Sequence, residues 1–221
     1  MFIQCIRLDP KRSGPRPGEG LKGSGVDQLM PMRERILRAA EDMLVEFGLQ
    51  SSMARIATRA GVAAGSIYNH FDSKEELIGA VYRRLSEEMT AAMLAADRPD
   101  ASPIRRLELY IDAYVDMFEA DSGRAILFEY LSSVPLIPGE ELIEVFAAPS
   151  AHIEGILQQL AAAELLRPGE PSMMGGFIGG AIRNTLKWRR AQKRPLTEAD
   201  RTQIRRMCLD AILKEAAGRA T

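Results

Sequence analysis

Apolar residues recur every three or four positions along most of the chain from Met32 onward, which is the spacing of one face of an α-helix. The first such stripe comprises Ile36, Leu37, Ala40, Met43, Leu44 and Phe47, and its helix ends at Gly48. Further helices are predicted near 53–60, near 64–70, from Ser73, from Pro103, from Gly123 through Leu131, over 140–166 with an interruption at Pro149, over 172–192 and over 197–216. No alternating strand pattern of useful length occurs, so the sequence predicts an all-α fold.

Several helix starts have recognisable caps. In Ser73-Lys74-Glu75-Glu76 the pattern of a capping box predicts that the serine hydroxyl and a glutamate each satisfy a free backbone amide. Ser102 precedes Pro103, and proline at the first helical position loses no hydrogen bond. These signals place a long helix directly after the short ones and a second long helix behind it.

Residues 1–31 differ from the rest, because they are rich in proline and glycine and show no apolar period. We interpret them as a flexible arm. Basic residues outnumber acidic ones in it by five to three, namely Arg7, Lys11, Arg12, Arg16 and Lys22 against Asp9, Glu19 and Asp27. The arm could touch DNA phosphates, be a plain tail, or precede a true start at Met30 or Met32.

Composition narrows the class of protein. The 221 residues include 46% hydrophobic and 27% charged residues, which is ordinary for a globular protein and excludes wholesale disorder, collagen and an integral membrane protein. The net charge of −1 predicts no general affinity for nucleic acid, so such binding would need a local patch. Cys5 and Cys208 form neither a disulfide framework nor a metal cage, and we expect a cytoplasmic protein without a cofactor.

The segment Met53–Phe71 has the layout of two short helices that cross steeply. Ala57 is small enough for a close crossing, and Gly61 accepts the positive φ of the turn. Ile56, Ala60, Val62 and Ile67 would face inward, which leaves an outward surface on the second helix that fits a DNA major groove. Arg55 and Arg59 are the only charges between Ser51 and Phe71, so this surface is predicted to carry a local charge of +2.

These residues carry a resemblance to a known family. RERILRAAEDMLVEFG, followed by IATRAGVAAGSIYNHFDSKEEL, resembles the N-terminal region of the TetR family of bacterial transcription regulators over about residues 32–82. The resemblance implies a three-helix helix-turn-helix domain at 32–78 and a helical bundle for ligand binding and dimerisation at 79–221. The rest of the chain shows only a compatible helical layout.

The resemblance also implies DNA-contacting residues: Ser52, Arg55, Ala64, Gly65, Ser66, Tyr68, Asn69, His70 and Lys74. Tyr68 would lie along a phosphate or thymine, and His70 and Lys74 would reach phosphates. Tyr68 could instead pack on the first helix, His70 could be a core residue and Lys74 a solvated charge. Ala63 departs from the family, which usually has a capping serine there, and its lack of a hydroxyl would cost the recognition helix about 1 kcal/mol.

Four glycines lie close together at Gly175, Gly176, Gly179 and Gly180, without a preceding strand or a dinucleotide fingerprint. Glycine costs a helix interior about 1 kcal/mol relative to alanine, so close packing against a partner helix is the favoured explanation, and a frayed or kinked start is the alternative. In the family the last two helices form the dimer interface. The interface predicted here comprises Gly175, Gly176, Gly179, Gly180, Ile204, Met207 and Ala211.

Aromatic residues and methionines gather in the C-terminal part, as in apolar pockets between bundle helices and also as in ordinary cores. The predicted contacts with an apolar or aromatic effector of unknown identity are Tyr110, Tyr114, Met117, Phe118, Phe128 and Trp188. A basic run from Arg183 to Arg194 could be a second nucleic-acid patch or a solvated helix end.

The resulting hypothesis is a homodimeric regulator, not an enzyme, that binds a palindromic operator on double-stranded DNA, without a membrane partner. A small molecule would release it, and repression is expected by analogy with the family. The alternative is a helical scaffold or ligand carrier that retains the fold without binding DNA. An all-α enzyme finds little support, because no acid, base and nucleophile converge and His152 stands apart.

Overall fold

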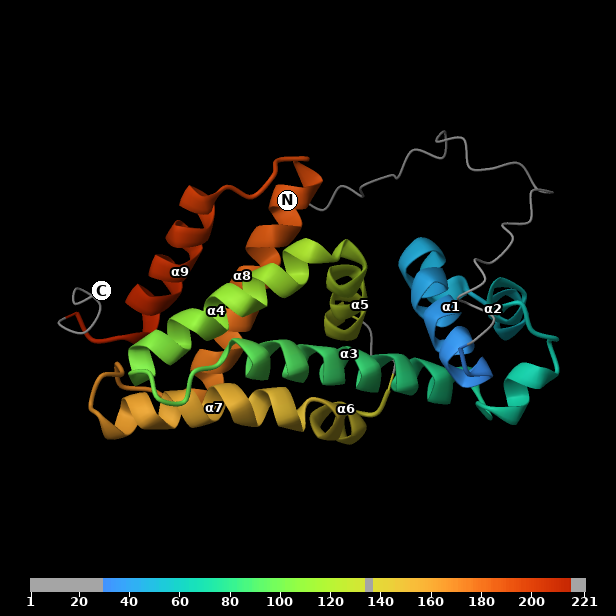
Figure 1. The fold of residues 1–221 in the computed structure, drawn as a ribbon, viewed down its shortest axis with the longest axis horizontal. Coiled ribbons are helices and arrows are strands. Elements are labelled where there is room, and N and C mark those ends of the chain that lie inside the picture. Colours follow the sequence, from blue (N-terminus) through green and yellow to red (C-terminus); the bar gives the residue numbers. More distant parts are fainter. Residues whose placement is uncertain (1–29, 134–136, 216–221) are drawn as a thin grey trace.

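The computed structural model describes residues 30–133 and 137–215, and in this part of the chain all elements are helical (Figure 1). The predicted arm lies outside the described residues except for Met30 and Pro31. The α-helices are α1 (Met32–Phe47), α2 (Met53–Ala60), α3 (Lys74–Ala96), α4 (Pro103–Ala120), α5 (Ser122–Ser133), α6 (Gly139–Val145), α7 (Ala147–Ala162), α8 (Pro171–Ala191) and α9 (Glu198–Ile212). Short 3-10 turns are η2 (Gly48–Gln50) and η3 (Ser66–Asn69).

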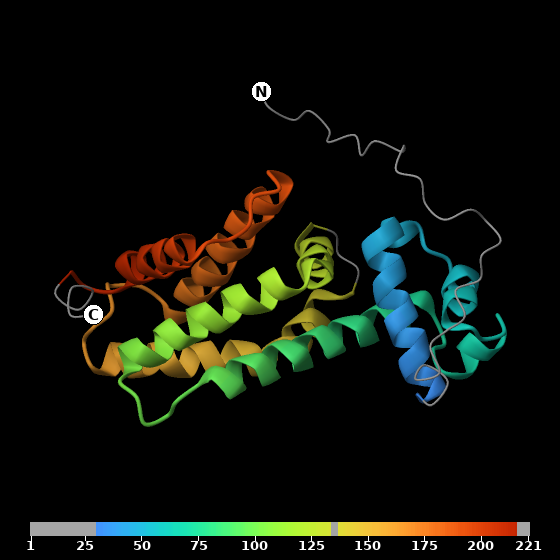
Figure 2. The same ribbon diagram turned by 45° about the horizontal axis from the view of Figure 1, so that its top comes forward.

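The molecule is elongated, with a small unit of α1, α2 and η3 at one end and the bundle at the other (Figures 1 and 2). Helix α3 starts in the small unit and continues through the length of the bundle. The domain boundary expected at residue 78 therefore lies inside a continuous helix. A movement of α3 would therefore displace residues in both units.

Helix α1 confirms the apolar stripe, because Ile36, Ala40 and Leu44 are all buried. Phe47, the last member of that stripe, is instead 40% exposed. Gly48 ends the helix with a φ of 61°, a conformation that favours glycine. The chain then turns away, which leaves the Phe47 ring at the surface.

The cap of α3 differs in one detail from the predicted box. The Ser73 hydroxyl accepts a hydrogen bond from the Glu76 amide at 3.0 Å, as expected. The Glu76 carboxylate accepts from the Asp72 amide at 2.6 Å and not from that of Ser73. The glutamate therefore fixes the residue before the cap and holds the approach to α3.

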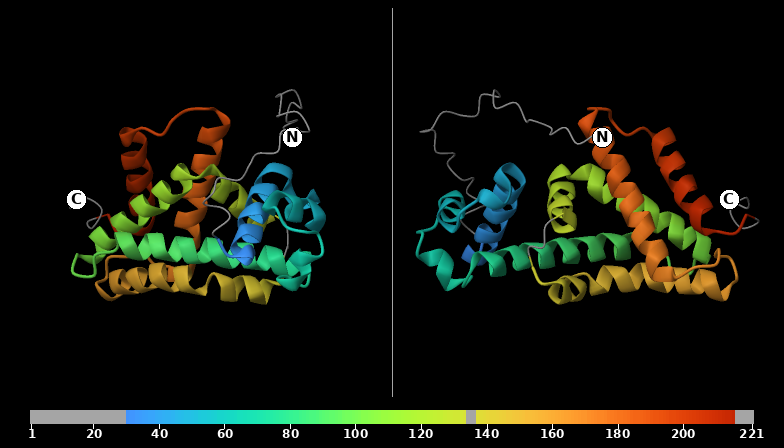
Figure 3. Two further views of the ribbon diagram at one scale, coloured as in Figure 1. Left: turned by 45° about the vertical axis from the view of Figure 1, so that its right-hand side comes forward. Right: turned by 180° about the vertical axis from the view of Figure 1, so that it is seen from behind.

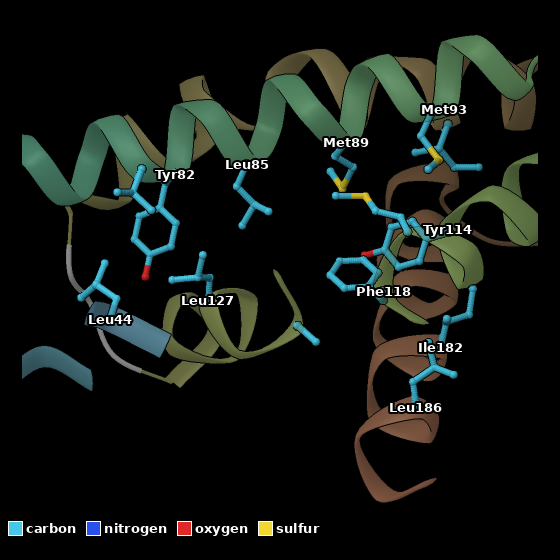
Figure 4. Close-up of a cluster of buried hydrophobic side chains, with 14 of the residues drawn as sticks. Leu44, Tyr82, Leu85, Met89, Met93, Tyr114, Phe118, Leu127, Ile182 and Leu186 are labelled. Atoms are coloured by element: carbon cyan, nitrogen blue, oxygen red, sulfur yellow. The ribbon is translucent and has the colours of Figure 1, made fainter. Parts of the chain in front are cut away.

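The bundle is centred on α4, which packs against α3, α7, α8 and α9. The spacing of three and four positions between Ile104, Leu107, Ile111, Tyr114 and Phe118 predicts an apolar seam on this helix. The last four are buried as predicted, and Ile104 is half-buried. Figure 4 shows two parts of the core: Met89 and Met93 of α3 and Ile182 and Leu186 of α8 lie on the side of Tyr114 and Phe118, whereas Tyr82 of α3 lies beside Leu44 of α1 and Leu127 of α5. This core joins the helix that leaves the small unit to the helices behind it.

The predicted helix over 140–166 is in fact two helices that meet at Phe146, where φ is −99° and ψ is 13°. Pro149 does not make the break. It lies in the first turn of α7, where a backbone amide would have no intrahelical partner. Helix α7 also ends at Ala162, earlier than expected.

Helix α9 ends at Ile212, short of the expected Ala216, which lies outside the described residues. Two backbone bonds explain the stop: Arg167 donates to the Ile212 carbonyl at 2.8 Å, and Lys214 donates to Leu165 at 2.9 Å. They flank an antiparallel bridge between Leu166 and Leu213. The end of α9 is thus tied to the end of α7.

Ion pairs connect the small unit to the bundle. Arg84 of α3 contacts Glu34 at 2.6 Å and Glu41 at 3.3 Å, both on α1. It also contacts Glu88 at 3.3 Å, and Arg124 of α5 reaches the same carboxylate at 2.9 Å. This junction network, comprising Glu34, Glu41, Arg84, Glu88 and Arg124, joins α1, α3 and α5.

Glu41 is the most perturbed member of the network. Burial raises its pKa from 4.5 to about 7, because the loss of hydration outweighs the attraction of Arg84. Between these two values the folded chain binds a proton that the unfolded chain releases, so this group lowers the free energy of unfolding as the pH rises from 4.5 to about 7.

We therefore expect Glu41→Gln to raise the free energy of unfolding at pH 8 by roughly 1–3 kcal/mol, and by clearly less at pH 5. Urea unfolding of both proteins at the two pH values measures this. The exposed Glu87 of α3 provides the matched control, and Glu87→Gln should leave stability within about 0.5 kcal/mol of the parent. An equal gain from Glu41→Gln at both pH values would contradict the account.

Candidate functional site

The turn between α2 and η3 has the expected geometry. Gly61 has a φ of 66° and a ψ of 37°, so the predicted left-handed residue is confirmed. The Ser52 hydroxyl caps α2 by accepting from the Arg55 amide at 3.3 Å. Arg35 of α1 donates to the carbonyls of Ala60 at 2.6 Å and Gly61 at 3.1 Å. Sequence reasoning missed this clamp, which fixes the turn on the first helix.

The second element is shorter than predicted. In place of a helix over 64–70 the chain forms the single 3-10 turn η3, in which the His70 amide bonds to the Ile67 carbonyl at 3.1 Å. The cause lies at its start, because neither Ala63 nor Gly65 has a side chain that can cap a free amide. Ile67 and Phe71 are buried and pin the turn to the small unit.

The outer side of η3 presents the predicted DNA-contacting side chains to solvent. Tyr68 is 53% exposed, so its ring does not pack into the first helix. Asn69, Ala64 and Gly65 are also exposed, whereas Ser66 and His70 are half-buried. Tyr68 and Asn69 thus form one accessible edge of η3. The turn η3 lies at the far end of the small unit, between α2 and α3 (Figure 1).

The cations near this edge are of two kinds. Arg59 lies 3.4 Å from Asp42 and 3.5 Å from Glu46, so the predicted local charge of +2 is too high. Arg55 instead lies over the Phe47 ring at 4.2 Å, and Arg33, which sequence reasoning missed, lies over the Phe71 ring at 5.0 Å. In the part of the chain that the structure describes, neither of these two is paired with a carboxylate.

Lys74 is already engaged within the chain. Its ammonium donates to the Leu49 carbonyl in η2, and the side chain is half-buried. The reading of Lys74 as a free solvated charge is therefore wrong. Its contact with a phosphate stays a prediction, and its removal would also release η2.

The glycines of α8 fall on two different faces of the helix. A Cβ on Gly175 would lie 3.5 Å from Ile153 of α7, and one on Gly179 would lie 3.1 Å from the Tyr114 hydroxyl of α4. These two allow α8 to approach its own bundle. Gly176 and Gly180 would meet nothing within 4 Å, so they leave a shallow strip on the outer face.

Large apolar side chains flank this strip. The exposed fractions are 72% for Met173, 54% for Phe177 and 53% for Trp188 on α8, and 62% for Met207 on α9. Figure 3 shows these two helices side by side at the edge of the bundle. We call this surface the α8–α9 face: Met173, Gly176, Phe177, Gly180, Trp188, Met207 and the exposed Ala211.

Gly175 and Gly179 were expected in a dimer interface but face α7 and α4 of their own chain. Two more predicted positions prove different here. Ile204 was expected in a dimer interface but is only 8% exposed within its own chain, so its side chain belongs to the local core. Trp188 was expected in an effector pocket but lies on the α8–α9 face. Helical phase explains both, because Trp188 shares the side of Phe177 and Ile204 shares that of Cys208.

The other predicted effector contacts do come together. The rings follow one another with centroid distances of 5.9 Å for Tyr110–Tyr114, 4.9 Å for Tyr114–Phe118 and 5.3 Å for Phe118–Phe128. Phe146 continues the series at 5.3 Å from Phe128, and the buried Met117 lies on the same helix α4. We call Tyr110, Tyr114, Phe118, Phe128 and Phe146 the aromatic row. Burial raises the pKa of Tyr110 and Tyr114, so both hydroxyls keep their protons.

Two surface grooves lie elsewhere in the bundle. One of about 920 Å³ is lined by Arg105, Glu108, Arg205 and Leu213 between α4 and α9. The other, of about 690 Å³, lies between α3 and the α6–α7 corner and is lined by Thr90, Leu94 and Val145. Neither groove includes a residue of the aromatic row.

His152 is half-buried beside Tyr110, with Nε2 3.9 Å from the Asp97 carboxylate. Burial lowers its pKa in spite of that carboxylate. Residues 30–133 and 137–215 contain no group of three His, Cys, Asp or Glu side chains that could hold a metal ion. Within the same ranges no helix has the length and apolar character needed to cross a membrane.

Comparison with known proteins points to regulators of transcription. The family model for bacterial regulatory proteins of the tetR family matches residues 36–81. The HTH-type transcriptional repressor BepR of Brucella suis is 35% identical over 102 residues, which cover 45% of this chain and 49% of that protein. The chain spans about half the length of the first curated relatives it matches.

Solved structures share the fold over most of their length. A putative tetR family transcription regulator from a Shewanella species aligns with a TM-score of 0.77 and 20% identity, covering 84% of this chain and all of that one. The transcriptional regulator FadR of Bacillus subtilis, solved in complex with stearoyl-CoA, aligns with a TM-score of 0.66 and 22% identity, covering 80% and 95%. The likeness thus extends from the helix-turn-helix into the bundle.

Proposed function

Because this chain belongs to the TetR family of bacterial regulatory proteins, we propose that it is a transcription regulator that binds a palindromic operator as a homodimer and is released by a small molecule. The observation that carries the proposal is the exposed edge of η3. There Tyr68 and Asn69 project from a turn whose inner side is pinned by Ile67. Such a projection suits entry into a major groove.

The proposed contacts divide by chemistry. Tyr68, Asn69 and Ser66 would reach base edges, helped by the small Ala64 and Gly65, which let the backbone approach. Ser52, His70 and Lys74 would contact phosphates together with Arg55. We add Arg33, because it is exposed and lies on the same small unit without a carboxylate partner among the described residues.

The α8–α9 face supports the proposed homodimer. It is rich in large exposed apolar side chains, and Gly176 and Gly180 lie among them, so a second copy of α8 could come close. A two-fold axis through this face would bring the same residues together from both copies. The two η3 edges would then read the two halves of a palindrome.

The aromatic row is the proposed effector site. FadR of Bacillus subtilis, a protein of the same fold, was solved with stearoyl-CoA, a compound with a long apolar acyl chain. Here Phe128 belongs to α5, which also packs on α1 and contributes Arg124 to the junction network. An effector that displaces Phe128 could therefore change the position of α1. Typical coupling of this kind is about 1–3 kcal/mol.

We propose repression as the sign of regulation, in line with the relative BepR. A ligand carrier that keeps the fold and does not bind DNA is the alternative, and the weak start of η3 at Ala63 favours it.

Fluorescence anisotropy of the full chain with duplex DNA, repeated from about 50 to 200 mM salt, separates the two functions. We expect binding whose affinity falls steeply with salt, by about a thousandfold if some six phosphates are contacted. A protein that binds no duplex at the lowest salt would be the carrier of the alternative. The anisotropy of the same DNA with BepR as a positive control verifies the assay.

A further inference from the structure

A guanidinium lies against the aromatic row. Arg183 of α8 donates through Nη1 to the Tyr114 hydroxyl, and its Cζ lies 4.9 Å from the centroid of the Phe128 ring. Gly179, one turn earlier, makes room for it, since a Cβ there would lie 3.1 Å from Nη1. The side chain is half-buried between α4, α5 and α8.

No carboxylate among the described residues balances this positive charge. Within residues 30–133 and 137–215, Arg183 makes no ion pair with a carboxylate. The sequence 131–136, which includes the last residues of α5 and reads LSSVPL, contains no acidic residue that could serve. A half-buried cation without a counter-charge is costly, which suggests that the counter-charge comes from a ligand.

Other arginines of the bundle have carboxylate partners or backbone carbonyl acceptors. Arg106 is paired with Asp97 at 2.7 Å, and Arg124 with Glu88 at 2.9 Å. Arg167 and Arg190 lack carboxylates, but they donate to backbone carbonyls at 2.9 Å and 3.1 Å. Among the described residues the hydrogen-bond partner of Arg183 is a neutral hydroxyl, so most of its five donors are available to a ligand.

We propose that Arg183 binds the carboxylate of an apolar organic acid, and that such acids are the class of effector. This inference rests on the proposed effector site and adds the chemical group that it recognises. The guanidinium can form two parallel bonds to a carboxylate. The Tyr114 hydroxyl, which accepts from Arg183, can donate its own proton to the same group.

The apolar part of the acid would lie along the aromatic row, next to this head-group site. Phe128 and Phe146 form the outer end of the aromatic row and are only partly buried. In Figure 4 Tyr114 and Phe118 point from α4 toward α8, which carries Arg183. A chain or ring bound along Phe128 would thus act on α5, the helix that reaches α1 through the junction network.

Isothermal titration of the full chain with sodium decanoate tests the proposal, with decan-1-ol as the neutral molecule of equal length. Two further ligands separate related classes of effector. Sodium benzoate is an aromatic acid, and decanoyl-CoA is a thioester that offers phosphates in place of a carboxylate. We expect decanoate or benzoate to bind and the alcohol to bind at least about tenfold more weakly. Arg183→Gln should weaken acid binding about 10- to 100-fold.

The control variant is Arg194→Gln, which removes an equal charge from an exposed position beyond the end of α8. It should bind the acid like the parent. Tyr114→Phe keeps the ring and should weaken acid binding about tenfold or less. If Arg183→Gln shows an altered circular dichroism spectrum, Arg183→Lys replaces it as the test variant, because it keeps the charge. Its affinity for the acid should lie between that of the parent and that of Arg183→Gln.

The proposal is overturned if neither acid binds the parent, if the alcohol binds as well as the acids, or if Arg183→Gln binds them unchanged. Binding of decanoyl-CoA alone, unaffected by Arg183→Gln, also overturns it. No DNA is present in this titration. If the chain binds the acid through Arg183 but binds no duplex DNA in the anisotropy experiment, the proposed acid site holds and the proposed regulator function is refuted.

Discussion

Phe177→Asp is expected to separate the proposed dimer into monomers, with a dissociation constant raised about 1,000-fold or more. Phe177 is 54% exposed in the single chain and lies at the middle of the α8–α9 face. Burying a phenylalanine contributes about 1.5–3 kcal/mol, and a two-fold interface contains it twice. The new carboxylates would also be desolvated at the interface, which costs several kcal/mol more. Sedimentation equilibrium over a range of protein concentrations measures the change.

The matched control is Ile143→Asp. Ile143 is an apolar residue of α6 with 74% exposure, and α6 lies away from the outer face of α8 and α9 (Figures 1 and 3). This variant should dimerise like the parent, because its new charge stays in water. Equal dissociation constants for Phe177→Asp and the parent would show that the dimer, if there is one, uses another surface.

Tyr68→Ala should weaken binding of a dimer to its operator about 30- to 1,000-fold. The tyrosine acts once in each half-site, and each lost contact costs about 1–2 kcal/mol. The change leaves the core intact, since Tyr68 is 53% exposed while Ile67 and Phe71 hold the turn. Anisotropy with an operator duplex gives the affinity, and sedimentation confirms that the variant remains a dimer.

Leu94→Ala is a suitable control for Tyr68→Ala, because Leu94 is 56% exposed on α3 within the bundle. It should bind operator DNA as the parent does. Lys74→Ala is less clean, because the loss of its bond to the Leu49 carbonyl would also lower stability. If Tyr68→Ala binds the operator as tightly as Leu94→Ala, the reading edge has been placed on the wrong residues.

Local signals in the sequence predicted much of this architecture. Gly61 predicted a left-handed turn, Ser73 and Ser102 predicted helix starts, and the apolar seam of α4 predicted its buried face. Each of these features depends on residues within one or two helical turns. The sequence carries such information directly, because caps and apolar stripes act over short distances.

Features that depend on distant partners could not be predicted. The clamp by Arg35 joins residues 25 and 26 positions apart, and Arg84 reaches Glu34 over 50 positions. Nor did the sequence show which face of α8 is outermost, so Trp188 was assigned to the effector site. The environment of Arg183 likewise depends on the packing of α4 and α5 against α8, which the sequence does not specify.

Selection of bound duplexes from a random pool, with the purified full chain, tests the central claim most directly. The account predicts enrichment of one palindrome with two equal half-sites, bound by two chains, and its loss from the selected pool when Tyr68→Ala is used. Enrichment of no sequence above the unselected pool, or of a single unrepeated half-site bound by one chain, would contradict it.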